Sequence, residues 1–121
     1  MDIWIEDSLA NRVNFRAAFK DAGMGDYFMT ERMQFVAGGT DFTLNNGLKL
    51  DIMVVMKGLE AYTFDECFQI ATIADIENIK IPFLHLNQLI ANKRAVNRNK
   101  DKTDVAELEK IKLLRKEMGQ D

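Results

Sequence analysis

The segment 42–54 constrains the fold most strongly, because apolar and polar residues alternate on both sides of Asn45-Asn46-Gly47. Alternation with a period of two is typical of a strand that buries one face. Asn-Gly tolerates the positive φ of a tight hairpin turn. The segment therefore predicts a β-hairpin. Its second strand points Leu50 and Ile52 into the core and Asp51 away from it.

A second aspartate lies on a predicted strand near the N-terminus. In Met1-Asp2-Ile3-Trp4-Ile5, alternation places Asp2 and Trp4 on one face and the isoleucines on the other. Strand interiors disfavour Asp, so its occurrence here and at Asp51 calls for an explanation. If the strands are neighbours, the two carboxylates meet and repel unless they share a proton or a cation. Each aspartate, taken singly, can also be a strand-end residue that reaches solvent.

The rest of the chain alternates helices with short strands. A helix begins at Asp7 or Ser8, and a second begins at the capping box of Thr63 and Glu66. Strands are predicted at 33–36 and between Ile73 and Ile81, where Pro82 ends them. Two C-terminal helices follow: the first covers 84–96, and Asp101 caps the second. The second predicted helix buries Phe64, Cys67, Phe68 and Ala71, and the last carries the apolar stripe Val105, Leu108, Ile111 and Leu113 or Leu114. This order predicts an α+β fold, a mixed β-sheet packed with helices, in a single domain over 1–121.

Composition excludes several classes of function. The chain has 121 residues with 47% hydrophobic and 29% charged residues, which is typical of a globular domain. One histidine, His85, and one cysteine, Cys67, exclude clustered zinc sites and an internal disulfide. No apolar run approaches the ~20 residues of a membrane span, and the N-terminus is acidic, so a cytoplasmic protein is expected. Acidic residues dominate 1–91, so sequence-specific DNA binding is not expected.

Basic residues concentrate instead in the joint between the last two helices, at 93–104. Lys and Arg neutralise phosphate oxygens, and neighbouring carboxylates can orient them. A phosphate site is one interpretation of this joint. A solvated helix–helix connection is the other.

Taken together, these features resemble the nucleotidyltransferase superfamily. The resemblance rests on Asp2 between hydrophobic residues, on Leu50-Asp51-Ile52, and on the pattern from Leu89 through Lys93 to Arg98-Asn99-Lys100-Asp101 and Asp104. It covers nearly the whole chain and is closest to small bacterial nucleotidyltransferase-like proteins of the abortive-infection and toxin–antitoxin type. The joint is its most specific part.

The resemblance implies that carboxylates hold Mg²⁺ ions, which clamp the triphosphate of a nucleoside triphosphate. Asp2 and Asp51 match two metal-holding, catalytic carboxylates. Lys93, Arg98 and Lys100 are then candidates for phosphate contact, and Asp101 and Asp104 for orienting those cations. The first aspartate of the family's Asp-x-Asp pair and the glycine turn before it would lie upstream of Met1. The resemblance therefore implies a fold that lacks its first strand and helix.

The expected function follows from this match. Complete relatives are expected to transfer a nucleoside monophosphate from a triphosphate to a hydroxyl group, and this chain alone is expected to have little or no such activity. The alternative is a non-catalytic, antitoxin-like interaction module. An exposed sheet edge then predicts a homodimer or a complex with another protein. A structural remnant without function is the third interpretation.

Overall fold

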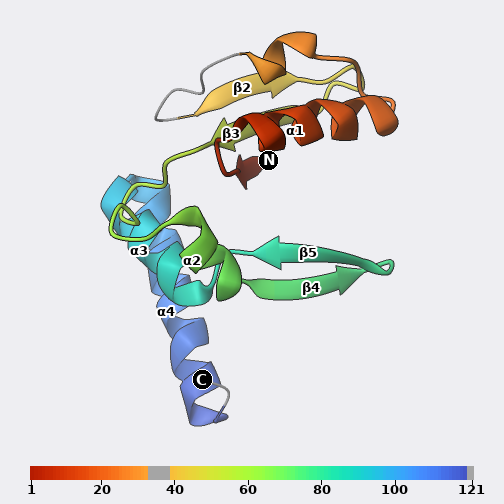
Figure 1. Ribbon diagram of the computed structural model, residues 1–121. Coiled ribbons are helices and arrows are strands. Elements are labelled where there is room, and N and C mark those ends of the chain that lie inside the picture. Colours follow the sequence, from red (N-terminus) through yellow and green to blue (C-terminus); the bar gives the residue numbers. More distant parts are fainter. Residues whose placement is uncertain (33–38, 120–121) are drawn as a thin grey trace. The chain divides into compact units, whose positions relative to one another are not determined.

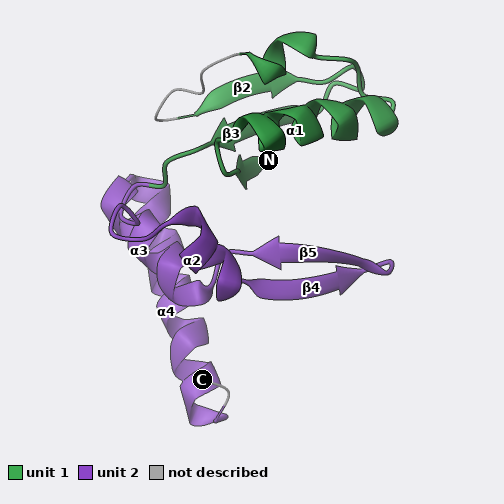
Figure 2. Ribbon diagram, in the orientation of Figure 1, with its two compact units in different colours: residues 1–56 green, residues 57–121 purple. Residues whose placement is uncertain are grey.

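The computed structural model describes residues 1–32 and 39–119 and shows an α+β protein (Figure 1). The chain divides into two compact units, residues 1–56 and residues 57–121 (Figure 2). The α+β class is thus confirmed, whereas the single domain over 1–121 stays a prediction. The strand expected at 33–36 lies outside the described residues.

Unit 1 is built on a three-stranded mixed sheet with the strand order β1-β3-β2. The edge strand β1 (Asp2–Trp4) runs parallel to the central strand β3 (Lys49–Met53), and β2 (Thr40–Thr43) runs antiparallel to it. The hairpin predicted from the Asn-Gly turn is therefore confirmed. At this turn Gly47 has a φ of +84°, and its N–H donates to the Leu44 carbonyl at 2.9 Å.

One face of this sheet is covered by the helix α1 (Leu9–Asp21). The Ser8 side chain caps the helix by accepting a hydrogen bond from the Asn11 N–H at 3.1 Å. A single turn of 3₁₀ helix, η1 (Phe28–Glu31), follows α1. The core of the unit lies between α1 and the sheet and comprises Ile5, Phe19, Leu44, Leu50 and Ile52. Alternation places Ile3 and Phe42 on this core face as well, and it leaves Asp2, Trp4, Asp41, Asp51 and Met53 on the face opposite α1.

Unit 2 combines three helices with a separate β-hairpin. Its elements are α2 (Phe64–Gln69), β4 (Thr72–Ile76), β5 (Ile79–Phe83), α3 (Leu86–Val96) and α4 (Asn99–Glu117). The capping box at the start of α2 is confirmed, since Thr63 and Glu66 bond reciprocally. The prediction of one mixed sheet for the whole chain was wrong in one respect. The strands β4 and β5 pair with each other and form a sheet of their own.

The segment that leads into α2 is held tightly against α3. A Cβ atom added to Gly58 would lie 2.6 Å from the Ala91 carbonyl oxygen and 2.8 Å from Ala95 Cβ. The Asn92 side chain donates to the Lys57 carbonyl at 2.8 Å, and Leu59 is buried. This close approach, together with a φ of +88°, requires glycine at position 58.

Four local predictions were wrong in detail. Pro82 does not end the strands but lies within β5. Phe68 is 48% exposed, because α2 has only six residues and presents a narrow buried face around Cys67. Arg98, and not Asp101, is the N-cap of α4. The apolar stripe predicted for this helix is buried only in part, since Ile111, Leu113 and Leu114 are exposed.

None of the helices formed by the described residues combines the length and the apolar character that crossing a bilayer requires.

Candidate functional site

The face of the unit 1 sheet opposite α1 brings the two predicted carboxylates together. Asp2 of β1 lies directly opposite Asp51 of β3, and Trp4 lies opposite Met53 on the same face. Two backbone bonds secure this register: the Asp51 N–H donates to the Met1 carbonyl at 2.8 Å, and the Ile5 N–H donates to the Met53 carbonyl at 2.9 Å. Neighbouring strands lie ~4.8 Å apart. The two strands are therefore neighbours, which is the condition under which Asp2 and Asp51 were expected to lie close together.

A third aspartate, which was not singled out from the sequence, lies beside this pair. Asp41 of β2 is opposite Asp51 on its other side, so Asp2, Asp51 and Asp41 form a row across the three strands. The position of the hairpin turn was sufficient to predict this neighbour. A turn centred on Asn46 places Phe42 opposite Leu50, and the next pair along the two strands is then Asp41 and Asp51.

The three aspartates do not converge like the ligands of a closed metal cage. Among residues 1–32 and 39–119, no group of three or more Asp, Glu, His or Cys side chains is arranged to hold a metal ion. Asp2 and Asp41 are exposed, and Asp51 between them is half-buried. The row is thus an acidic strip on a sheet face. The carboxylates of Asp2 and Asp41 each repel the carboxylate of Asp51 between them.

The predicted phosphate residues of unit 2 lie around the turn from α3 to α4. Asn97 ends α3 in the left-handed conformation with a φ of +56°. Asp101 follows in the first turn of α4, and its side chain is 1% exposed. It accepts hydrogen bonds from the Arg98 N–H at 3.1 Å and from Arg98 Nε at 2.6 Å. These bonds from Arg98 lower the pKa of the Asp101 carboxyl to about 2.

The cations of this turn divide into two groups. Lys93 Nζ lies 2.9 Å from Asp104 Oδ2 and 3.7 Å from Asp101 Oδ1, so Lys93 joins α3 to α4. Arg98 holds Asp101, although its side chain is 57% exposed. Lys100, in contrast, lies exposed on the first turn of α4. Asp101 and Asp104 thus form direct ion pairs with Lys93 and Arg98. Their role in orienting cations toward a phosphate, and phosphate contact by Lys93, Arg98 and Lys100, stay predictions.

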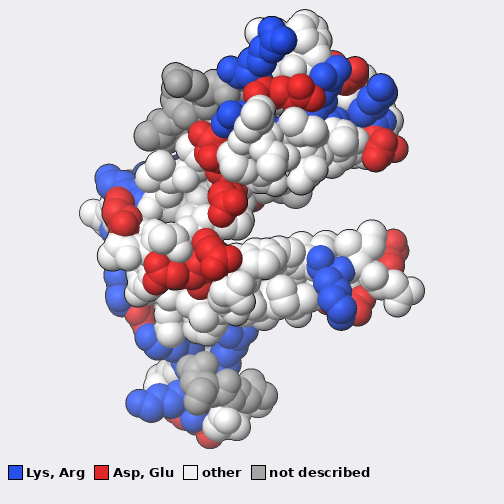
Figure 3. All heavy atoms as spheres, in the orientation of Figure 1, with Lys and Arg blue, Asp and Glu red and all other residues white. Residues whose placement is uncertain are grey.

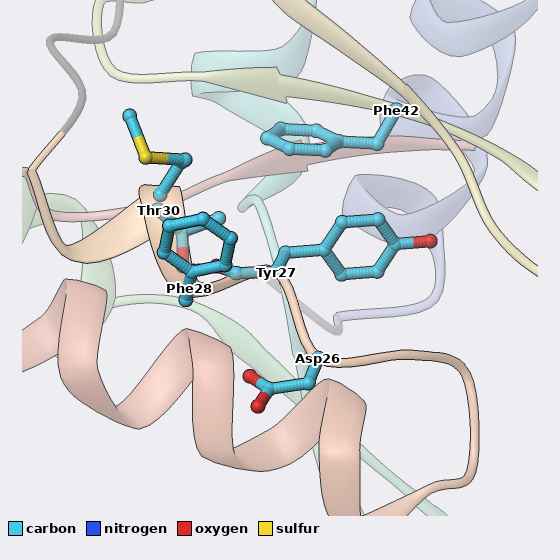
Figure 4. A pocket seen from close by; sticks show the side chains of 6 residues that line it. Asp26, Tyr27, Phe28, Thr30 and Phe42 are labelled. Carbon is cyan, nitrogen blue, oxygen red and sulfur yellow. The ribbon is translucent and has the colours of Figure 1, made fainter.

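A pocket of about 280 Å³ lies in unit 1 beside β2 (Figure 4). Rings of Tyr27, Phe28 and Phe42 line it, together with Met29, Thr30 and the carboxylate of Asp26. Asp26 is engaged by Arg16, whose Nε lies 2.6 Å from Asp26 Oδ1, and this bond lowers the pKa of the Asp26 carboxyl. The lining is therefore mainly apolar and contains none of the predicted phosphate or metal residues.

The single histidine and the single cysteine have structural positions. The Nδ1 atom of His85 accepts a hydrogen bond from the Asn87 N–H at 3.1 Å, so His85 is the N-cap of α3. Cys67 is 2% exposed, and burial raises the pKa of its thiol. A buried thiol with a raised pKa is a poor nucleophile.

Comparison of the chain with protein-family models, with curated proteins and with solved structures found no significant match in any of the three.

Proposed function

We propose that this protein is a nucleotidyltransferase-like domain that binds Mg²⁺ together with a nucleoside triphosphate. The observation that carries the proposal is the position of Asp2 opposite Asp51 on neighbouring parallel strands of a sheet face that α1 leaves open. Strand interiors seldom carry aspartate, and two carboxylates at adjacent strand positions destabilise the sheet unless a cation lies between them.

The donors fit Mg²⁺ in a particular way. This ion is usually held by one or two carboxylates, by water and by the phosphates of the substrate, and seldom by a cage made only of protein ligands. Asp2 and Asp51 supply two carboxylates from strands whose backbone bonds fix their positions. The triphosphate and water supply the remaining oxygens. A site with two protein ligands is thus suited to an ion that arrives with its nucleotide.

The reaction class implied is the transfer of a nucleoside monophosphate. The oxygen of an acceptor hydroxyl forms a bond to the α-phosphorus and loses its proton to solvent. The bond from that phosphorus to the bridging oxygen breaks, and pyrophosphate leaves with the electron pair. Positioning of the triphosphate supplies most of the catalysis in such reactions. Asp2 and Asp51 provide two carboxylates where the resemblance implies three. We therefore expect this chain to bind Mg²⁺ and the nucleoside triphosphate but, alone, to transfer little or no nucleoside monophosphate.

Binding is therefore the property to test first. Mn²⁺ can replace Mg²⁺ as a paramagnetic probe, and its binding can be titrated in the absence and presence of ATP or GTP. We expect the nucleotide to tighten Mn²⁺ binding, and we expect Asp2→Asn and Asp51→Asn to remove this effect.

Asp75→Asn is the matched control, because Asp75 is also a strand aspartate but belongs to the β4–β5 sheet and pairs with Lys80. It should leave Mn²⁺ binding unchanged. Equal Mn²⁺ binding by the natural chain and by Asp51→Asn would contradict the proposal. Transfer of label from a nucleoside triphosphate to components of a cell lysate, if lost in Asp51→Ala, would show instead that the chain is a competent enzyme.

A further inference from the structure

The β4–β5 hairpin of unit 2 is a two-stranded sheet with an apolar face. Ile76, Ile79 and Phe83 share that face and are 49%, 63% and 51% exposed. In Figure 1 both strands project away from the helices of their unit, and in Figure 3 most of the hairpin surface in view is uncharged. An isolated two-stranded hairpin is at best marginally stable in water, so this element is suited to gain further strands.

The two edges of the hairpin differ in their capacity to pair. In an antiparallel ladder, hydrogen-bonded and non-hydrogen-bonded pairs alternate. The two turn residues Glu77 and Asn78 both have positive φ, as in a type I′ turn, so Ile76 and Ile79 form the hydrogen-bonded pair that closes the hairpin. Three steps along the ladder, Pro82 of β5 falls in a non-hydrogen-bonded pair. Its nitrogen therefore points outward and has no hydrogen to donate.

The edge of β5 is thus blocked, whereas the edge of β4 is complete. The same alternation directs the N–H and C=O groups of Ile73 and Asp75 outward from β4. Neither residue is a proline, and four of the five residues of β4 are exposed. β4 is therefore the edge that can accept another strand.

We infer that β4 pairs with β4 of a second copy of this chain, antiparallel about a twofold axis at Ala74. In this register the outward N–H and C=O of Ile73 form two hydrogen bonds with those of Asp75 of the second copy. Asp75 forms two more with Ile73 of the second copy, so the pairing has four backbone hydrogen bonds. All five residues of β4 are paired. The pairing is isologous, so the same edge is used up on both copies and the sheet closes at four strands.

The side chains select this register over its neighbours. Pairing about Ala74 places Asp75 opposite Ile73 of the second copy, so no like charges face each other. A register centred on Asp75 would oppose two carboxylates and is disfavoured. A register centred on Ile73 would pair only three strand residues, because β4 begins at Thr72. The apolar faces of both hairpins then lie on one side of the four-stranded sheet. This dimer does not depend on the proposed nucleotide site of unit 1.

A designed cysteine tests the twofold axis directly. In Ala74→Cys, the two introduced thiols form a non-hydrogen-bonded pair with a Cα–Cα separation of ~4.5 Å, within the range for a disulfide. We expect this variant to form a covalent dimer in mild oxidant. Ile76→Cys is the control, since Ile76 would lie opposite Thr72 of the second copy and not opposite itself. The natural thiol, Cys67, is buried in both variants.

Sedimentation velocity of the natural chain over a wide concentration range should show a reversible monomer–dimer equilibrium. Ile73→Pro removes two symmetry-related donors and should raise the dimer dissociation constant about tenfold or more. Lys80→Pro, the matched change on the edge of β5, should leave it within about twofold. Circular dichroism should show that both variants keep their helices.

The inference is overturned by a natural chain that stays monomeric at every concentration, which would leave the β4 edge to a different protein. It is also overturned if Ala74→Cys and Ile76→Cys cross-link to the same extent. The same holds if Ile73→Pro and Lys80→Pro raise the dimer dissociation constant by the same factor.

Discussion

Replacing Asp51 by Asn should stabilise unit 1 in buffer that contains no divalent cation. Asp51 lies between Asp2 and Asp41, so the substitution removes two like-charge cross-strand pairs. Each such pair is worth ~0.2–1 kcal/mol, and the expected gain in the free energy of unfolding is therefore about 0.4–2 kcal/mol at low ionic strength. The gain should shrink as added salt screens the exposed carboxylates.

Trp4 makes this change measurable in unit 1 itself. It is the only tryptophan of the chain and lies on β1, on the same face as Asp2. Urea unfolding followed by Trp4 fluorescence should give the free energy of unfolding with and without Mg²⁺. For the natural protein, Mg²⁺ at ten times its dissociation constant should add about 1.4 kcal/mol, and for Asp51→Asn it should add nothing.

Asp75→Asn is again the control and should be neutral or slightly destabilising, because its ion pair with Lys80 is exposed. The reasoning is refuted if Asp51→Asn lowers the stability of unit 1, or leaves it unchanged, in metal-free buffer at low salt. That result would mean that the three carboxylates of the row do not repel one another and need no cation.

Three further substitutions test unit 2 by urea unfolding monitored by circular dichroism. Gly58→Ala should destabilise it by about 2–4 kcal/mol, because the new Cβ would meet the Ala91 carbonyl oxygen at 2.6 Å in a left-handed backbone conformation; a neutral result would contradict this packing. Asp101 has a pKa lowered to about 2 by Arg98, below its unfolded value of ~3.9, so its stabilising effect should be present above about pH 4 and lost as the pH falls towards 2. Asp101→Asn should be less stable than the natural chain near neutral pH, and the difference should vanish in acid; a difference that persists at low pH would argue against the ion pairs. Gln88 is 8% exposed and its Oε1 has no hydrogen-bond partner among the described residues, so Gln88→Met should be stabilising by about 1 kcal/mol, whereas a loss of stability would show that this oxygen is satisfied.

Local signals were sufficient where neighbouring residues decide the conformation. The Asn-Gly turn, the capping box of Thr63 and Glu66, and the alternation around Asp51 were all recognisable, because each depends on backbone geometry within a few residues. The same principle shows why Asp41 could have been found: the turn already determines the pairing of its two strands.

Contacts between distant segments decided the rest. β1 and β3 are separated by more than 40 residues, so only the folded chain places Asp2 opposite Asp51. The sequence likewise predicted a cluster of charge at 93–104. Which cations pair with Asp101 and Asp104 depends on the turn angle between α3 and α4, and no pattern of charges specifies it.

Pro82 illustrates the same division between sequence and tertiary structure. Its lack of a backbone N–H is evident from the sequence, which predicts that a strand ends there. Only the pairing of β4 with β5 shows that its nitrogen points outward, where a missing donor leaves the ladder intact and blocks one edge instead. Residue type thus determines what a backbone group can do, whereas the tertiary structure decides which neighbour it meets.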